Sequence, residues 1–156
     1  MDFFPNINLN IVNHQFDNIK HKNFDLIIGG GGFRGYYHIG SLYILKDLEQ
    51  QNKIKIRQII GTSSGAIAAV NYACDVDFNK WLDSYNDIKN LMDDGLDLHN
   101  ATITVLKNKL PQNAHILCNQ QNVKIVTTKF DWWPFKFTEV VFDNFISFDF
   151  LIDCLS

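Results

Sequence analysis

Residues 54–70, IKIRQIIGTSSGAIAAV, decide the fold because they change within a few positions from a strand pattern to a helix pattern. The isoleucines between positions 54 and 60 are typical of a buried strand. Gly61 to Gly65 then forms a turn rich in glycine and serine, and the small apolar residues after it favour a helix. A strand that turns so abruptly into a helix is a building block of α/β folds.

A second unit of the same kind comes earlier in the chain. The apolar run from Phe24 to Ile28 ends in four glycines, and from Gly35 to Gln51 apolar residues recur on one helical face. The order strand, helix, strand, helix predicts an α/β fold, a three-layer sandwich with a mainly parallel central sheet. Both glycine turns would then lie at the carboxyl ends of the strands, where such sheets bind ligands.

The remaining chain extends this pattern less clearly. Asp77 to Met92 predicts a helix, 123–128 and 137–142 predict strands, and 148–155 predicts a final helix, whereas 99–119 favours no element. Residues 1–23 are rich in asparagine and alternate apolar with polar residues, so we expect an N-terminal arm or edge strand there. Residues 24–156 are expected to form one domain.

Composition narrows the class of protein. A chain of 156 residues with 46% apolar and 20% charged residues fits one globular domain. The net charge of -3, without a basic cluster, argues against nucleic acid as a partner. The three cysteines form no CxxC motif, and no metal or cofactor is predicted. Neither a secretory signal nor a membrane-spanning run is visible, so we expect a cytoplasmic protein.

Gly61-Thr62-Ser63-Ser64-Gly65 fits the Gly-x-Ser-x-Gly motif of serine hydrolases, in the strand-to-helix context that the motif requires. The glycines at Gly61 and Gly65 would let the strained turn form and let the helix pack closely on its strand. The helix N-terminus behind Ser63 would favour a developing oxyanion. Ser63 is therefore the candidate nucleophile, although the pentapeptide alone also fits an ordinary βα turn.

The other glycine loop, Gly29 to Gly35, follows a buried strand and opens a helix. Its consecutive N–H groups can form an anion nest, which predicts an oxyanion hole. The loop also satisfies Gly-x-Gly-x-x-Gly, but a dinucleotide site would need an acidic residue at the end of the next strand. That strand ends in Gly61, and Asp47 and Glu49 lie on the helix. We therefore favour the oxyanion hole over a cofactor site.

Taken together, GGGFRG at 30–35, His38-Ile39-Gly40 and GTSSGA at 61–66 resemble the patatin-like phospholipase family. The resemblance runs from about Phe24 to Cys74. It implies hydrolysis of acyl esters in phospholipids or neutral lipids by a Ser-Asp dyad without histidine. The site residues that it implies are Ser63 as nucleophile, Gly30, Gly31, Gly32 and Arg34 as the oxyanion-hole segment, and Gly35, Gly61 and Gly65 as motif glycines.

A base for Ser63 is harder to find. A serine hydroxyl is a weak nucleophile until a carboxylate or another base takes its proton. The resemblance implies an Asp-Gly-Gly or Asp-Gly-Ala motif much later in the chain, and the sequence contains only Asp94-Gly95, followed by leucine. Asp94 is a weak candidate because Gly95 also fits the end of a helix. We therefore expect a C-terminally truncated family member with little activity of its own.

Histidines and aromatic residues leave further alternatives open. His99 or His115 could complete a Ser-Asp-His triad, against the family pattern, and His38 is expected to be structural. Residues 130–150 are unusually aromatic, which favours packing in the core over docking on a membrane surface.

The predicted function is a lipid acyl hydrolase, with a catalytically silent homologue that binds lipid or a protein partner as the alternative. The predicted partner is a lipid ester, with peripheral membrane contact left open and the oligomeric state undecided.

Overall fold

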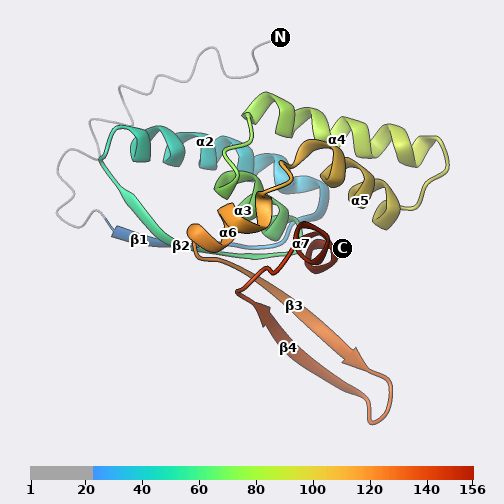
Figure 1. Ribbon diagram of the computed structural model, residues 1–156. Helices are drawn as coiled ribbons and strands as arrows, with labels where there is room; N and C mark the ends of the chain where they lie inside the picture. The colour runs from blue at the N-terminus through green and yellow to red at the C-terminus, as the bar shows by residue number, and fades with distance from the viewer. Residues whose placement is uncertain (1–22) are drawn as a thin grey trace.

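The computed structural model describes residues 23–156, so the arm predicted for residues 1–23 lies outside the described residues except for Asn23 (Figure 1). The elements follow one another as β1 (Asn23–Ile28), η1 (Gly32–Gly35), α2 (Tyr36–Gln50), β2 (Lys55–Thr62), α3 (Ser64–Ala73), α4 (Phe78–Asp93), α5 (Leu98–Lys109), α6 (Ala114–Gln120), β3 (Val123–Asp131), β4 (Lys136–Phe142) and α7 (Phe148–Leu155).

The described strands form one sheet in the order β1-β2-β3-β4. β1, β2 and β3 are parallel, and β4 returns antiparallel to β3. Ile28 pairs with Gly61, and Thr62 pairs with Val126. The glycine loop after β1 and Ser63 after β2 therefore leave the same carboxyl edge of neighbouring strands, and the predicted α/β fold with a mainly parallel sheet is confirmed.

Helices cover one face of this sheet (Figure 1). Ile28, Ile59 and Ile125 are buried in the core with α3, whereas Ile27 on the opposite face is 75% exposed. Successive strand residues point to opposite faces, so this alternation marks a sheet buried on one side. The described residues thus form the sheet and one helical layer of the predicted sandwich.

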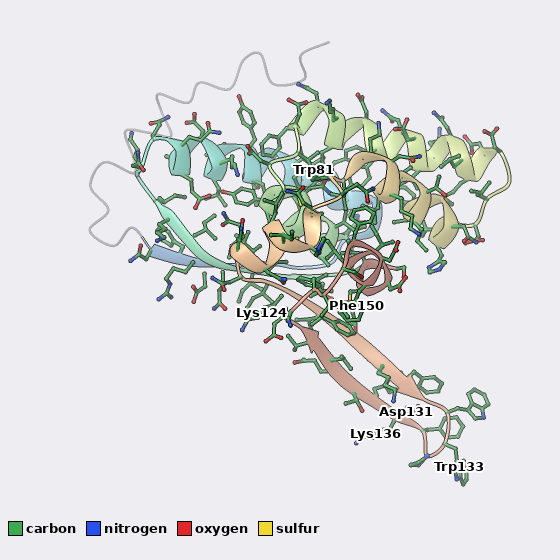
Figure 2. All side chains as sticks on the ribbon, in the orientation of Figure 1. Trp81, Lys124, Asp131, Trp133, Lys136 and Phe150 are labelled. Atoms are coloured by element: carbon green, nitrogen blue, oxygen red, sulfur yellow. The ribbon has the colours of Figure 1, made fainter. Side chains whose placement is uncertain are left out.

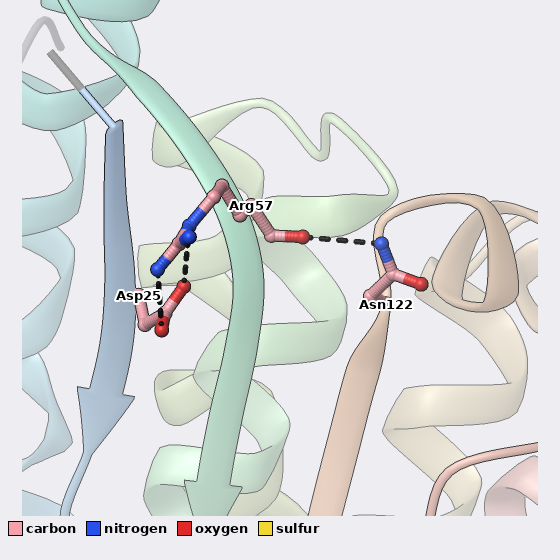
Figure 3. A network of polar contacts seen from close by, with 3 residues as sticks. All are labelled: Asp25, Arg57 and Asn122. Atoms are coloured by element: carbon pink, nitrogen blue, oxygen red, sulfur yellow. Dashed lines mark hydrogen bonds and ion pairs between the residues drawn. The ribbon is translucent and has the colours of Figure 1, made fainter.

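At the amino edge, a polar network ties the first three strands together (Figure 3). Arg57 of β2 donates to both carboxylate oxygens of Asp25 in β1, at 3.0 and 2.9 Å. The Asn122 side chain, just before β3, donates to the Arg57 carbonyl at 3.1 Å. These contacts fix the strands at the end opposite Ser63, and the bidentate geometry of Arg57 makes the pairing directional.

Residues 99–119, for which the sequence favours no element, form most of α5 and most of α6. Asp97 caps α5, its carboxylate accepting from the Asn100 backbone N–H at 3.0 Å. This hydrogen bond, together with one from the Asn100 side chain, holds the pKa of Asp97 below its usual range. Pro111 lies between the two helices, and proline interrupts a helix. This residue is the sequence signal that could have divided the region into two helices.

The largest departure from expectation is the hairpin of β3 and β4. It projects away from the body of the molecule (Figures 1 and 2). The prediction that the aromatic residues of 130–150 pack in the core is correct for Phe145, which is 1% exposed. It is wrong for the end of the hairpin, where Trp132 is 74% and Trp133 84% exposed. The physical reason is the register: β3 continues to Asp131, well past Val126, where its pairing with β2 ends, so its outer half has only β4 beside it.

Candidate active site

Ser63 is the only residue between β2 and α3. Its backbone has φ 53° and ψ -130°, a conformation that L-residues rarely adopt. The Ser63 carbonyl accepts from the Ala66 N–H at 2.8 Å and so already belongs to the first turn of α3. A serine in strained backbone on a sharp strand-to-helix turn has the geometry of a nucleophile elbow.

The two motif glycines are required by close packing around this turn. A Cβ atom on Gly61 would come within 2.6 Å of the Ala66 Cα atom and would also collide with the Gly65 carbonyl oxygen. A Cβ atom on Gly65 would collide with the Ile28 carbonyl oxygen and lie 2.6 Å from that of Gly29. The elbow therefore packs directly against the end of β1, where the glycine loop begins.

Gly30 brings that loop to the nucleophile. A Cβ atom built on Gly30 would lie 3.1 Å from the Ser63 Cβ atom and 3.6 Å from Ser63 Oγ. Gly32 has φ +54°, a left-handed conformation that glycine adopts without strain. The structure thus brings together the two loops that the sequence singles out.

A hydrogen bond that sequence reasoning missed joins the two loops. The Gly31 N–H donates to the Ser64 side-chain oxygen at 2.9 Å, and Ser64 is 7% exposed. This N–H is therefore engaged within the protein and is not directed at a ligand. The doubled serine of the Gly-x-Ser-Ser-Gly motif is the signal that could have indicated it.

The other predicted members of the loop lie farther from the nucleophile. Arg34 is exposed in η1, and its backbone N–H donates to the Gly31 carbonyl at 3.0 Å. Gly35 is buried against the Tyr85 hydroxyl, which a Cβ atom at that position would contact. Burial, together with the neighbouring Tyr36, raises the pKa of Tyr85 to about 12, so its hydroxyl stays protonated at neutral pH.

Ser63 opens into a cavity of about 490 Å³. This volume lies within the range of small-molecule binding sites. Its walls come from η1, α3, α4, α5 and α7, and most of the surface that they expose to the cavity is apolar. The apolar side chains are Phe33, Ile67, Trp81, Ile88, Leu98, Val105, Leu106 and Leu155, and the polar ones are Ser63, Ser64, Asn71, Ser84, Tyr85, His99, Thr102, Lys109 and Ser156.

No aspartate or glutamate lines this cavity among the residues that the structure describes. His99 lies on its wall as an exposed side chain, and Lys109 pairs with Asp87 at 2.7 Å. His115, the other histidine considered for a triad, is not part of the lining.

Asp94, the weak candidate base, caps the C-terminus of α4 and is exposed. Gly95 has φ +99° and donates to the Met92 carbonyl, and Leu96 donates to that of Leu91. These two bonds form a Schellman motif. Asp94 does not line the cavity that holds Ser63.

The family model described as patatin-like phospholipase matches residues 26–140, which include both glycine loops and Ser63. The chain belongs to the patatin-like phospholipase family. The family is one of lipid hydrolases, in agreement with the apolar cavity beside Ser63. Searches of curated proteins and of solved structures each found no match. Of the helices that the structure describes, none has both the length and the apolar character needed to cross a membrane.

Proposed function

We propose that this patatin-like protein is a serine acyl hydrolase that cleaves lipid esters with Ser63 as its nucleophile. The observation that carries the proposal is the strained Ser63 elbow at the mouth of a mainly apolar cavity. Strain is kept in a fold where it serves a function, because an unstrained turn would cost less free energy. An apolar cavity with a few polar groups at one end suits an ester that carries an acyl chain.

The reaction proceeds by acyl transfer. The Ser63 Oγ atom attacks the ester carbonyl, its proton passes to a base, and the carbonyl oxygen becomes an oxyanion. We expect the N–H groups at the start of α3 and in the Gly30 and Gly32 region to stabilise this charge. The oxyanion collapses, the alcohol leaves with the proton, and water then hydrolyses the acyl-enzyme to release the acid and restore Ser63.

The base is a separate part of the proposal. A carboxylate has to reach Ser63 Oγ, and the cavity contains none among residues 23–156. We propose that the carboxylate comes from outside these residues and that Asp94 is not the base. Without that carboxylate, residues 23–156 would form only a slow esterase, because Ser63 would be poorly activated.

A fluorophosphonate probe tests the nucleophile directly, because it reacts covalently with an activated serine. We expect slow labelling of Ser63, located by mass spectrometry of the digested protein, and no labelling of Ser63→Ala. Ser84→Ala is the matched control, since Ser84 lines the same cavity but donates its hydroxyl to the Lys80 carbonyl at 3.0 Å. Loss of labelling in Ser84→Ala, or labelling that survives Ser63→Ala, contradicts Ser63 as the nucleophile.

Turnover of a chromogenic short-chain ester tests the base. Asp94→Ala is expected to leave the slow rate unchanged, because Asp94 is the C-cap residue of α4 and does not line the cavity. Fast turnover by the wild-type chain, lost in either Asp94→Ala or His99→Ala, contradicts a base supplied from elsewhere.

The lack of a carboxylate in the described cavity also favours a second candidate function. A silent homologue would use the same cavity to bind an acyl chain without cleaving it. Binding of a fluorescent fatty acid in the cavity, with no probe labelling at Ser63 after prolonged incubation, would support this second function over the first.

A further inference from the structure

The end of the β3–β4 hairpin carries five exposed aromatic side chains, which we call the aromatic tip: Phe130, Trp132, Trp133, Phe135 and Phe137. Their exposed fractions range from 46% to 84%. Figure 2 shows Trp133 at the far end of the hairpin and Asp131 and Lys136 just before it, distant from the helices. So many exposed aromatic side chains in one place mark an interaction surface.

The rings of the tip contact one another. Phe130 lies 5.1 Å from Phe137, its cross-strand partner, and 6.0 Å from Trp132, while Trp132 lies 5.4 Å from Phe135, measured between ring centroids. Such contacts hold four of the five rings as one apolar cluster. Trp133, the most exposed member at 84%, extends beyond them.

The strand register places the tip relative to Ser63. Thr62, the residue before Ser63, pairs with Val126, and β3 then continues from Thr127 to Asp131 in the same direction. At about 3.3 Å per residue, the tip stands roughly 17 Å beyond the carboxyl edge of the sheet. A flat surface that touches the tip would therefore face the edge at which the Ser63 cavity opens.

The base of the hairpin is also connected to the cavity wall. The ring of Phe142, at the end of β4, packs edge-on against Phe150 of α7 at 5.9 Å. Leu155, on the same helix, lines the cavity. The hairpin and the Ser63 cavity therefore share α7 as a common support.

Charge at the tip differs from that of the rest of the chain. Lys129 precedes the aromatic residues of the tip and Lys136 lies among them, with Asp131 as the only acidic residue between positions 129 and 137, although the chain as a whole carries -3. Lys129 and Asp131 form an ion pair, with 2.8 Å between Lys129 Nζ and Asp131 Oδ1. Tryptophan and phenylalanine beside lysine suit the boundary between anionic headgroups and acyl chains.

We propose that the aromatic tip docks this protein on a lipid bilayer that carries anionic headgroups and so holds the Ser63 edge against its substrate. The choice of a lipid surface rests on the proposed function, because a lipid hydrolase must reach esters held in a bilayer. Trp132, Trp133 and Phe135 enter the interfacial layer, and Lys136 contacts the headgroups.

Vesicle co-sedimentation tests the proposal without relying on hydrolysis. Vesicles of ether-linked phosphatidylcholine with about one-third ether-linked phosphatidylserine offer the surface but no cleavable acyl ester. We expect the wild-type chain to sediment with them and the Trp132→Ala, Trp133→Ala double variant to lose at least about tenfold in partitioning. Lys136→Gln should lose about fivefold.

Ile146→Ala is the matched control, since Ile146 is 76% exposed but lies beyond the other end of β4. Its partitioning should equal that of the wild type. Tryptophan emission gives a second readout: vesicles should shift it to shorter wavelength through Trp132 and Trp133, because Trp81 is 1% exposed and already buried.

The proposal is overturned if the wild-type chain stays in the supernatant, or if the double variant sediments as well as the wild type. It is also overturned if the double substitution converts a dimer to a monomer in sedimentation velocity while vesicle binding is unchanged, because the tip would then join two copies of the chain. Failure of probe labelling at Ser63 would remove the proposed hydrolysis and leave the vesicle result standing.

Discussion

The Ser63 elbow and the aromatic tip both lie on the carboxyl side of the sheet, but packing restricts them to very different degrees. At the elbow, a single added methyl group on Gly61 or Gly65 would collide with backbone atoms. At the tip, Trp133 is 84% exposed, and among residues 23–156 the aromatic rings of the tip contact only other rings of the tip. Packing against the rest of the fold therefore fixes the conformation of the elbow, whereas the side chains of the tip can adjust to a binding partner.

Because of this difference, a substitution at the elbow should change stability and reactivity together, whereas a substitution at the tip should change binding alone. At the elbow, stability and reactivity are tied to the same few backbone atoms, because Gly65 packs on the end of β1 and Ser63 precedes it by two positions. At the tip, loss of a side chain should change binding without changing the fold. Three variants, each with a control variant, test this contrast.

The largest effect is expected for Gly65→Ala. The new Cβ atom would collide with the carbonyl oxygens of Ile28 and Gly29, and β1 can retreat only by breaking its pairing with β2. We expect a loss of about 3 kcal/mol or more in the free energy of unfolding. Urea denaturation followed by circular dichroism measures this loss.

Gly40→Ala provides the control for that experiment. Gly40 lies inside α2, and apart from the helix's own backbone no heavy atom of residues 23–156 lies within 4 Å of an added Cβ atom. Alanine should therefore stabilise the helix by about 0.5–1 kcal/mol. If Gly65→Ala is as stable as the wild type, the close packing of the elbow on β1 is wrong.

A smaller effect of opposite sign is expected for Ser63→Gly. Glycine adopts φ 53° and ψ -130° without the steric cost that serine pays, although it also gains entropy in the unfolded chain. The net gain should be about 1 kcal/mol in the free energy of unfolding, together with complete loss of probe labelling.

Ser63→Ala separates strain from the loss of the hydroxyl, because alanine keeps a Cβ atom in the same backbone conformation. It should abolish labelling as well, yet change stability by less than about 0.5 kcal/mol. Equal stability of the glycine and alanine variants would mean that the strain relieved by glycine is no larger than its entropic cost in the unfolded chain.

The elbow was predictable from sequence because its determinants are local. Glycines at both ends of a short turn, a strand before it and a helix after it all lie between Ile54 and Val70. The same holds for the glycine loop, and parallel strand order then brings the two loops to one edge. The sequence reasoning missed the bond from Gly31 to Ser64, because it joins residues 33 positions apart and the doubled serine by itself does not identify its partner.

The cavity and the tip depend on packing between distant elements, and for that reason they were not predictable. The cavity walls bring α4, α5 and α7 together with α3, and most of α5 lies in the region for which the sequence favours no element. Composition does not distinguish the aromatic residues of 130–150 from one another. Phe145 is buried because the Asn119 side chain donates to its carbonyl and accepts from its N–H, each at 2.9 Å. Trp132 and Trp133 are exposed because β3 extends past β2.

The smallest effect is expected for the Trp132→Ala, Trp133→Ala double variant. Both side chains are exposed and the described helices lie elsewhere, so the free energy of unfolding should change by less than about 0.5 kcal/mol. Trp81→Ala is the matched contrast: Trp81 is 1% exposed in the core, and its removal should cost about 3–5 kcal/mol. Both values come from the same urea titration.

If the double variant loses more than about 1 kcal/mol, the two rings stabilise the fold, and a drop in its vesicle binding could no longer be assigned to docking. If stability is unchanged and vesicle binding falls, the rings act at the lipid surface, and the tip differs from the elbow in being shaped by its ligand.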